Sequence, residues 1–187
     1  MRDSDGSFSS FDPPGSDYTV PWSTNTGGEV AGFFYGGSAA TQGFVRDATG
    51  NITVFTVPNA YATTAFQIND SGSITGLWDP ANNFVYAQGY TRDPSGTFTT
   101  FVAPGTGPQG NTYSNSINAS GEVTGYAADG ASPYSYFGFI QSGAGTPVEF
   151  SDPLAVNMTE ALKINNSGLV VGSYSDGTTG HDFVGKP

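Results

Sequence analysis

Residues 68–76 read Ile-Asn-Asp-Ser-Gly-Ser-Ile-Thr-Gly, and closely similar stretches occupy residues 117–125 and 164–172. A more divergent copy occupies residues 24–32. The final glycines of the four copies, at positions 32, 76, 125 and 172, are separated by 44, 49 and 47 residues. This period is typical of four-stranded propeller blades, so the sequence predicts a β-propeller.

A second repeated block fixes the phase of the repeat. Residues 46–55, which begin Arg-Asp, align without gaps on residues 92–101 and on residues 2–11, and a degraded copy occupies residues 141–150. An aromatic strand precedes the block at residues 43–45, 89–91 and 138–140, and a fourth such strand, residues 182–184, has no block after it. Residues 2–11 match that absent block. We therefore expect the two termini to complete one repeat and close the ring, which would leave no long sheet edge exposed.

The predicted fold is all-β: a four-bladed β-propeller of four repeats of about 47 residues, each with four strands, forming one domain over residues 1–187. The composition agrees, with 27 glycines, 14% aromatic residues and no long stretch suited to a helix. In each repeat we expect a first strand like Ile52–Val57, a second ending at Ile68–Asn69, a third like Ser73–Trp78 and a fourth like Gln88–Arg92. The alternative is an open array, or part of a larger ring completed by other copies.

Two recurring turn motifs separate these strands. Asn-x-x-Gly lies between the second and third strands and Asp-x-x-Gly lies after the fourth. The Asn or Asp side chain can bond the backbone two residues on, and Gly tolerates positive φ. Three turn asparagines, Asn69, Asn118 and Asn165, also match glycosylation sequons, but their position follows the repeat, so we interpret them as turn residues.

Charge and cysteine content exclude several classes of partner. The chain has 16 acidic and 5 basic residues, a net charge of −11, which disfavours nucleic acid and anionic membranes. There is no cysteine, and therefore no disulfide and no thiolate metal site. Residues 1–6 contain no apolar stretch, and nothing in the chain predicts membrane insertion. We expect an extracellular or cell-surface protein whose signal peptide has been removed.

The repeated unit resembles a known family. Its pattern is Gly-Phe-Val-Arg-Asp, then Gly-x-x-Thr-x-Phe-x-x-Pro, then Ala-x-x-Ile-Asn-x-x-Gly-x-x-x-Gly, and it is similar to the HAF family of bacterial extracellular repeats over nearly the whole chain. His181-Asp182-Phe183 matches the name-giving His-Ala-Phe most closely, while residues 42–44, 88–90 and 137–139 depart from it. The resemblance implies an exported, propeller-like protein, and it carries no catalytic motif.

Few residues suit catalysis. His181 is the only histidine, and there is no Gly-x-Ser-x-Gly motif, so we interpret His181 as a structural strand residue, with a Ser-His-Asp site as the alternative. Residues 3–6 and the pair Asp129-Gly130 resemble fragments of calcium loops but lack the full ligand spacing. The sequence predicts no catalytic residue, no metal site and no cofactor.

The basic residues occupy repeat positions. Arg2, Arg46 and Arg92 share one position beside an Asp, where they either grip an anionic ligand or cap the turn; we favour the cap. Lys163 replaces Ser or Gln on a second strand, facing either the channel or solvent.

Loop length supplies the functional signal. One face of the propeller is expected to carry only short turns, and the other long loops at residues 13–22, 35–42, 58–64, 79–87, 104–114, 127–136 and 152–160. Variable aromatic loops on a regular scaffold commonly form binding sites. The candidate ligand-binding residues are Trp22, Tyr35, Trp78, Asp79, Asn82, Tyr86, Asp129, Tyr134 and Tyr136.

These features favour a non-catalytic binding module over an enzyme, with a carbohydrate or surface polymer as the ligand, because aromatic rings flanked by amides and carboxylates suit sugar rings. One alternative is a polysaccharide lyase or hydrolase that uses the same face with Lys163 or His181. The other is a structural surface or matrix protein that associates with copies of itself.

Overall fold

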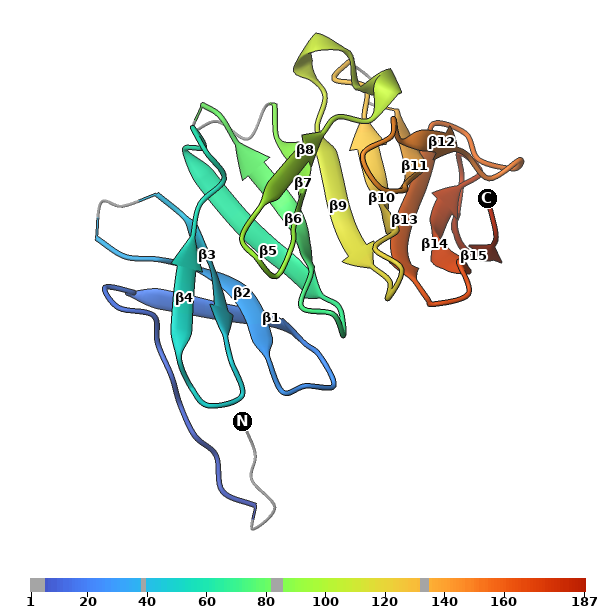
Figure 1. Ribbon diagram of the computed structural model, residues 1–187. Helices are drawn as coiled ribbons and strands as arrows, with labels where there is room; N and C mark the ends of the chain where they lie inside the picture. Colours follow the sequence, from blue (N-terminus) through green and yellow to red (C-terminus); the bar gives the residue numbers. More distant parts are fainter. Residues whose placement is uncertain (1–5, 38–39, 82–85, 132–134) are drawn as a thin grey trace.

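The computed structural model describes residues 6–37, 40–81, 86–131 and 135–187 (Figure 1). Within these ranges the chain consists of strands and one short 3-10 helix, η1 (Pro104–Gln109). None of the helical structure described there is long and apolar enough to cross a membrane. The strands are β1 (Tyr18–Thr24), β2 (Val30–Tyr35), β3 (Gln42–Arg46), β4 (Ile52–Phe55), β5 (Ala62–Ile68), β6 (Ile74–Asp79), β7 (Gln88–Arg92), β8 (Phe98–Phe101), β9 (Thr112–Ile117), β10 (Val123–Ala128), β11 (Tyr136–Gln141), β12 (Val148–Phe150), β13 (Met158–Ile164), β14 (Val170–Ser175) and β15 (Gly180–Gly185).

The strands form antiparallel sheets in chain order, which confirms the all-β prediction. Strands β1–β4 form one sheet and β5–β8 a second. A third, seven-stranded sheet contains β9–β12 and β13–β15, joined by one parallel residue pair between Tyr136 and Met158. We call β1–β4, β5–β8, β9–β12 and β13–β15 the first, second, third and fourth units.

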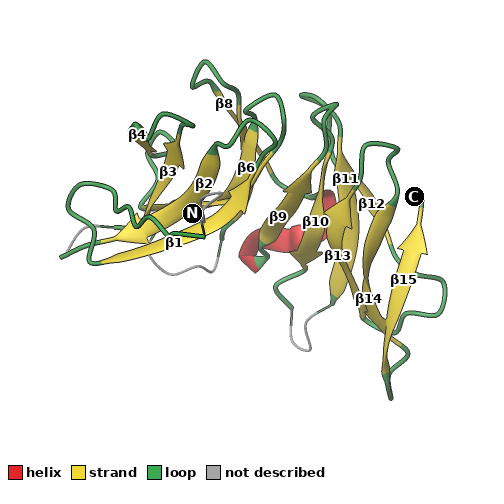
Figure 2. Cartoon of the chain, turned by 90° about the horizontal axis from the view of Figure 1, so that it is seen from below, coloured by secondary structure: helices red, strands yellow, loops and turns green. Residues whose placement is uncertain are grey.

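Two details of the predicted propeller are wrong. The strand Ile52–Phe55 pairs with β3, which precedes it, so each unit begins one strand later than predicted. The ring is also open, because the N-terminal segment lies beside the first unit, far from β15 (Figures 1 and 2). Phe11 packs edge-on against Phe44 of β3, with ring centroids 5.9 Å apart, and this contact holds the segment at the first unit. The open arrangement agrees with the alternative expectation.

A phenylalanine at the end of each outer strand packs against the next unit. Phe101 of β8 lies edge-on to Phe139 of β11, with centroids 5.9 Å apart, and Phe150 of β12 lies against Phe183 of β15 at 6.0 Å. Phe55 of β4 joins Tyr90 of β7 in one buried cluster. Opposite each phenylalanine the neighbouring strand has a glycine that the ring covers: the pairs are Gly43–Phe55, Gly89–Phe101 and Gly138–Phe150. The core is therefore divided among the interfaces between units.

A β-bulge explains the final glycine of each repeat. The register shifts once along the first strand of every unit, for example between Ala65 and Gln67. The bulge brings that strand so close to its neighbour that a Cβ on Gly76 would lie 1.9 Å from the Thr64 carbonyl oxygen, and one on Gly125 would lie 1.8 Å from that of Tyr113. Only glycine avoids this overlap.

The repeated turns close the hairpins as predicted. Asn69 Oδ1 accepts hydrogen bonds from the backbone N–H groups of Ser71 and Ser73, at 3.1 and 2.9 Å, and Gly72 has φ +80°. Asp47 Oδ1 accepts in the same way from Thr49 and Asn51, at 2.9 and 2.8 Å. Side-chain acceptors thus fix both turn classes.

These aspartate turns predict acid sensitivity. Hydrogen bonds from Asn51 and Thr49 lower the pKa of Asp47 to about 2. In the same way, hydrogen bonds from the Ser95 hydroxyl and the Thr97 backbone N–H lower the pKa of Asp93. The stabilisation is complete above the unfolded pKa, about 4, and is lost as pH falls through the folded pKa. We expect the free energy of unfolding, measured by denaturant titration, to decrease between about pH 4 and pH 2. The double variant Asp47→Asn and Asp93→Asn should flatten this slope, and an unchanged slope would contradict the assignment.

Candidate functional site

The alternating strand directions gather the connections at two ends. One end, the short-turn end, carries the turns β1–β2, β3–β4, β5–β6, β7–β8, β9–β10, β11–β12 and β13–β14. The other, the long-loop end, carries the remaining connections, as the loop lengths predict. Several strands extend further into the predicted loops than expected: β1 begins at Tyr18, β9 at Thr112 and β13 at Met158.

Three tyrosines of the third unit form a cluster near the long-loop end. The rings of Tyr113 and Tyr126 stack with centroids 4.8 Å apart and 25° between planes, and Tyr136 lies edge-on to Tyr126 at 6.0 Å. The register explains the stack, because Tyr113 of β9 pairs directly with Tyr126 of β10. All three side chains are half-buried. We call Tyr113, Tyr126 and Tyr136 the tyrosine cluster.

A half-buried carboxylate on the fourth unit adjoins this cluster. Burial raises the pKa of Glu160, on β13. Burial first, and then the nearby Glu160, Tyr113 and Tyr136, raise the pKa of Tyr126 to about 12, so that its hydroxyl stays protonated. Among the residues that the structure describes, no hydrogen bond or ion pair reaches the Glu160 carboxylate. An acceptor of this kind, left without a partner beside aromatic rings, can receive a donor from a ligand.

A second aromatic pair lies at the long-loop end of the first unit. Tyr18 and Tyr35 stack with centroids 5.2 Å apart and 26° between planes, and their exposed fractions are 56% and 45%. The backbone N–H of Asp17 donates to the Tyr35 carbonyl at 2.9 Å and holds the two strand ends together. Of the predicted ligand-binding residues, Tyr35 and Tyr136 thus each join an aromatic group, but on different units.

The predicted tryptophans serve other surfaces. Trp22 lies within β1, at its bulge, and contacts Phe33 and Phe66 at centroid distances of 5.9 and 5.4 Å. Trp78, on β6, packs against the buried cluster that contains Phe55. Neither side chain belongs to the tyrosine cluster.

The predicted loop carboxylates stabilise their own loops. Asp79 is fully buried, and its Oδ1 accepts from the backbone N–H of Ala81 at 2.9 Å. Asp129 Oδ1 accepts from the N–H groups of Ser135 and Ala131, at 3.1 and 3.0 Å, which lowers its pKa. Of the other predicted residues, Tyr86 is partly exposed, whereas Asn82 and Tyr134 lie outside the described residues.

Sequence reasoning missed Tyr126 and Glu160 because both lie within strands and not in loops. A signal was present: Tyr126 directly follows the final glycine of its repeat, where the other repeats have Phe33, Leu77 and Ser173. If β9 and β10 are aligned with one extra residue in β9 for the bulge, Tyr126 lies opposite Tyr113. The bulge itself has no clear sequence mark.

The arginines cap turns, in agreement with the interpretation favoured from the sequence. Arg46 and Arg92 donate from Nη1 to the carbonyl oxygens of Asp47 and Asp93, each at 3.2 Å. The Arg92 guanidinium also lies over the ring of Phe55, 4.9 Å from its centroid, and so links two units. Arg2 lies outside the described residues.

Lys163 faces the space between units. Its Nζ donates to Gln67 Oε1 at 3.2 Å, which connects the fourth unit to the second, and partial burial lowers its pKa. Lys163 therefore connects two units while remaining exposed to solvent.

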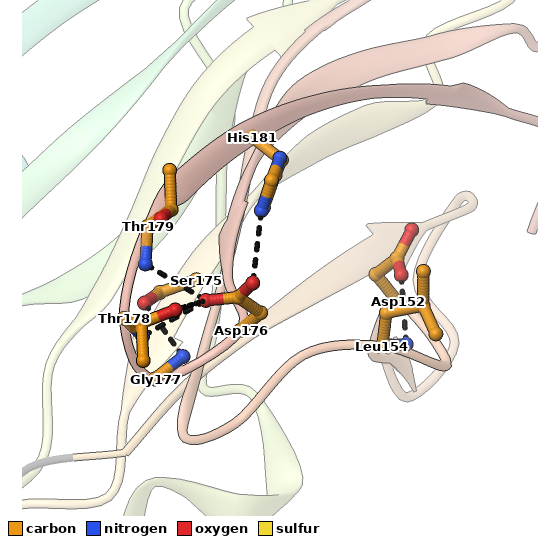
Figure 3. Close-up of polar contacts among 8 residues, drawn as sticks. All are labelled: Asp152, Leu154, Ser175, Asp176, Gly177, Thr178, Thr179 and His181. Carbon is orange, nitrogen blue, oxygen red and sulfur yellow. Dashed lines mark hydrogen bonds and ion pairs between the residues drawn. The ribbon is translucent and has the colours of Figure 1, made fainter.

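His181 forms an exposed pair with Asp176 beside the β14–β15 loop (Figure 3). Asp176 Oδ2 lies 3.2 Å from His181 Nε2, while its Oδ1 accepts from the backbone N–H groups of Thr178 and Thr179. The hydrogen bond from the Thr178 hydroxyl, together with these backbone bonds and the His181 contact, holds the pKa of Asp176 well below its usual range. The imidazole stacks on Tyr174 at 5.0 Å. Within the part of the chain that the structure describes, the contacts of the His181 ring are the Asp176 carboxylate and the Tyr174 ring.

The turn asparagines form a ladder at the short-turn end. Each Nδ2 donates to the carbonyl of the next turn's asparagine: Asn25 to Asn69 at 3.1 Å, Asn69 to Asn118 at 2.8 Å, and Asn118 to Asn165 at 3.2 Å. All four units line a polar pocket of about 380 Å³ around this ladder. Because the ladder satisfies these amides within the protein, we assign them a structural role.

Comparison with known proteins shows a likeness in fold but no match in sequence. No protein-family model matches the sequence, and no curated protein sequence matches it either. The fold is similar to that in a solved structure titled "Streptogramin B lyase structure", a β-propeller-like protein, with a TM-score of 0.54 and 14% sequence identity. The alignment covers 90% of this chain and 55% of the other, so this chain spans about half the length of that protein. At this identity the likeness shows the fold alone.

Proposed function

We propose that this chain is a non-catalytic extracellular binding module that binds carbohydrate at the tyrosine cluster. The observation that carries the proposal is the Glu160 carboxylate, which is half-buried near Tyr126 of the tyrosine cluster and has no partner among the described residues. A carboxylate that is partly removed from water and has no protein partner is well suited to accept hydrogen bonds from a ligand. The resemblance to HAF repeats supports an extracellular location.

Carbohydrate suits this combination of groups. A sugar ring has an apolar C–H face that packs on an aromatic ring and hydroxyl groups that donate to a carboxylate. Tyr113 and Tyr126 already stack on each other, which leaves the edge-on ring of Tyr136, at the start of β11, as the most suitable platform. The Tyr126 hydroxyl, like that of any tyrosine, is protonated at neutral pH and can donate to a sugar oxygen.

The variant Glu160→Gln tests this proposal. It keeps the shape of the side chain but removes the charged acceptor, so we expect glycan affinity to fall by roughly 10- to 100-fold, because hydrogen bonds to a charged group contribute about 1.5–3 kcal/mol. The melting temperature should rise, because the raised pKa of Glu160 shows that the folded protein disfavours the charged form at neutral pH. A glycan array followed by titration calorimetry measures the affinity.

The variant Tyr136→Ala should also weaken glycan binding, while Tyr35→Ala, on the first unit, is the matched control and should leave it unchanged. Absence of binding to every glycan, or equal affinity of wild type and Glu160→Gln, would reject the proposal. Turnover of a polysaccharide that is lost in His181→Ala would instead favour the lyase or hydrolase alternative.

A further inference from the structure

The polar pocket around the asparagine ladder contains a second, incomplete row of contacts. The pocket has a volume of about 380 Å³, and residues of all four units line it. Most of its polar side chains already have partners within the protein: the ladder pairs the turn asparagines, and Gln67 donates from Nε2 to the Ile117 carbonyl at 3.3 Å and accepts from Lys163 at Oε1. A ligand of this pocket must therefore use other groups.

The second row consists of the residues that directly follow the turn asparagines. They are Thr26, Asp70, Ala119 and Asn166, which are all exposed and all line the pocket, and we call them the rim residues. The Thr26 backbone N–H donates to Asp70 Oδ1 at 3.0 Å, and the Ala119 N–H donates to Asn166 Oδ1 at 2.9 Å. The repeat thus directs each N–H to the rim residue of the next unit. The Asp70 N–H is directed to Ala119, whose methyl group cannot accept a hydrogen bond.

This gap leaves three groups with unused hydrogen-bonding capacity. In the part of the chain that the structure describes, the Asp70 N–H has no acceptor. The Asn166 amide lies beside Ala119, because its Oδ1 accepts from the Ala119 N–H, and no described acceptor reaches its Nδ2. The Asp70 carboxylate accepts from the Thr26 N–H and hydroxyl at Oδ1, and its Oδ2 has no described donor. Two donors and one charged acceptor therefore line the same pocket.

This combination of groups indicates the chemical class of the ligand. An inorganic anion would accept from both donors, but the Asp70 carboxylate would repel it. A bare metal ion would bind the carboxylate but leave both donors without an acceptor. A hydroxyl group both donates and accepts, so a molecule with several adjacent hydroxyls can satisfy all three groups. The pocket is much larger than one water, about 30 Å³, and lies within the usual range for small ligands, about 300–1,000 Å³.

We propose that this pocket binds a small polyol, from glycerol to a hexose in size, over Ala119 and between Asp70 and Asn166. The site lies at the short-turn end, opposite the tyrosine cluster, and does not depend on the function proposed for that cluster. The gap lies between the second and fourth units, so the described chain supplies all the groups that the proposal uses. Alanine at position 119 keeps the gap open, since Asp or Asn occupies the same position in the neighbouring turns.

The variant Ala119→Asn should close the gap. Residues 118–120 would then read Asn-Asn-Ser, as residues 165–167 already do, so the turn should keep its conformation. The new Oδ1 should accept from the Asp70 N–H and raise the melting temperature by roughly 2–4 °C. The matched control is Ala48→Asn, which introduces the same side chain at an exposed position of the β3–β4 turn, at the same end but outside the pocket.

Binding is measured by titrating glycerol, erythritol, D-xylose and D-glucose separately into the isotope-labelled full chain and following the backbone amide signals by NMR. We expect at least one polyol to shift the Asp70 and Ala119 signals saturably, in roughly the millimolar range, in wild type and in Ala48→Asn. Affinity should fall at least about 10-fold in Ala119→Asn, and also in Asp70→Asn, which keeps the Oδ1 acceptor but removes the charge.

Calcium chloride is the alternative probe in the same titration. Saturable shifts with calcium chloride but with none of the polyols would overturn the proposal, because they would assign the pocket to a cation. Shifts confined to signals around Tyr136 would overturn it too, since they would place the polyol at the tyrosine cluster. The absence of shifts with every probe, or equal affinity of wild type and Ala119→Asn, would also reject it.

Discussion

Phe101→Ala should be among the most destabilising single substitutions in the protein. Phe101 is 8% exposed, packs edge-on against Phe139 across the interface of the second and third units, and covers Gly89 on its own sheet. Truncation of such a ring leaves a cavity and costs about 3–5 kcal/mol. For a chain of this size we expect the melting temperature to fall by roughly 10 °C, measured by differential scanning calorimetry.

The matched control is Phe8→Ala. Phe8 precedes Phe11 in the N-terminal copy of the same repeat and is 78% exposed. Its truncation should change the free energy of unfolding by less than about 0.5 kcal/mol. Equal destabilisation by the two variants would show that the interfaces between units do not hold the core.

Asn118→Asp should distinguish the contribution of the ladder to stability from the contribution of the turn. The Asn118 Oδ1 accepts from the N–H groups of Ser120 and Glu122, and an Asp can keep these bonds. The Nδ2 donates to the Asn165 carbonyl and to Glu122 Oε2, and an Asp loses both bonds and brings two carboxylates together. Because the side chain is 2% exposed, we expect a loss of about 2–3 kcal/mol in chemical denaturation.

Asn165→Asp is the control at the end of the ladder. Its Oδ1 makes the same turn bonds, to Ser167 and Leu169, but its amide reaches no acceptor within the described chain. This variant should lose less than about 1 kcal/mol in the free energy of unfolding. A loss as large as that of Asn118→Asp would show that the turn, and not the ladder, is the stabilising element.

The periodic features of the fold could be predicted because their causes are local. The Asn-x-x-Gly motif, as in Asn69 and Gly72, closes a hairpin by local interactions alone. The Asn side chain accepts hydrogen bonds from backbone N–H groups of the same turn, and the Gly adopts a positive φ. The spacing of these turns then predicts strands of the right length. The association of strands into units was misjudged by one strand because β4 matches the pattern of a first strand equally well, and only its pairing with β3 decides the matter.

Ring closure could not be judged from the same pattern. Residues 2–11 have the sequence of an outer strand, but the sequence does not say whether their phenylalanine packs on the first unit, on the fourth, or on both. In the structure Phe11 packs on Phe44. The sequence pattern predicts that Phe11 packs on an aromatic residue of a neighbouring unit. Whether residues 2–11 also reach the fourth unit depends on the curvature of the whole array, which no local pattern specifies.

The candidate site was predicted only in part. Aromatic enrichment of the long-loop end selected Tyr136 and Tyr35 as candidate ligand-binding residues, and the structure places each of them in an aromatic group. Trp78 is also aromatic and also lies next to a long loop, yet it packs against a core cluster. The difference arises from neighbours in adjacent units, and no local pattern contains that information.

The phenylalanine at the end of each outer strand packs in the core of the following unit, and this determines where a repeat can be gained or lost. Because Phe55 and Phe101 each complete the core of the unit that follows, a duplication of residues 56–101 inserted after residue 101 would add one unit with a complete interface on both sides. A duplication cut within a unit would instead produce two incomplete cores. Gain or loss of whole repeats is therefore tolerated by the fold, and arrays of different lengths can evolve without new core sequences.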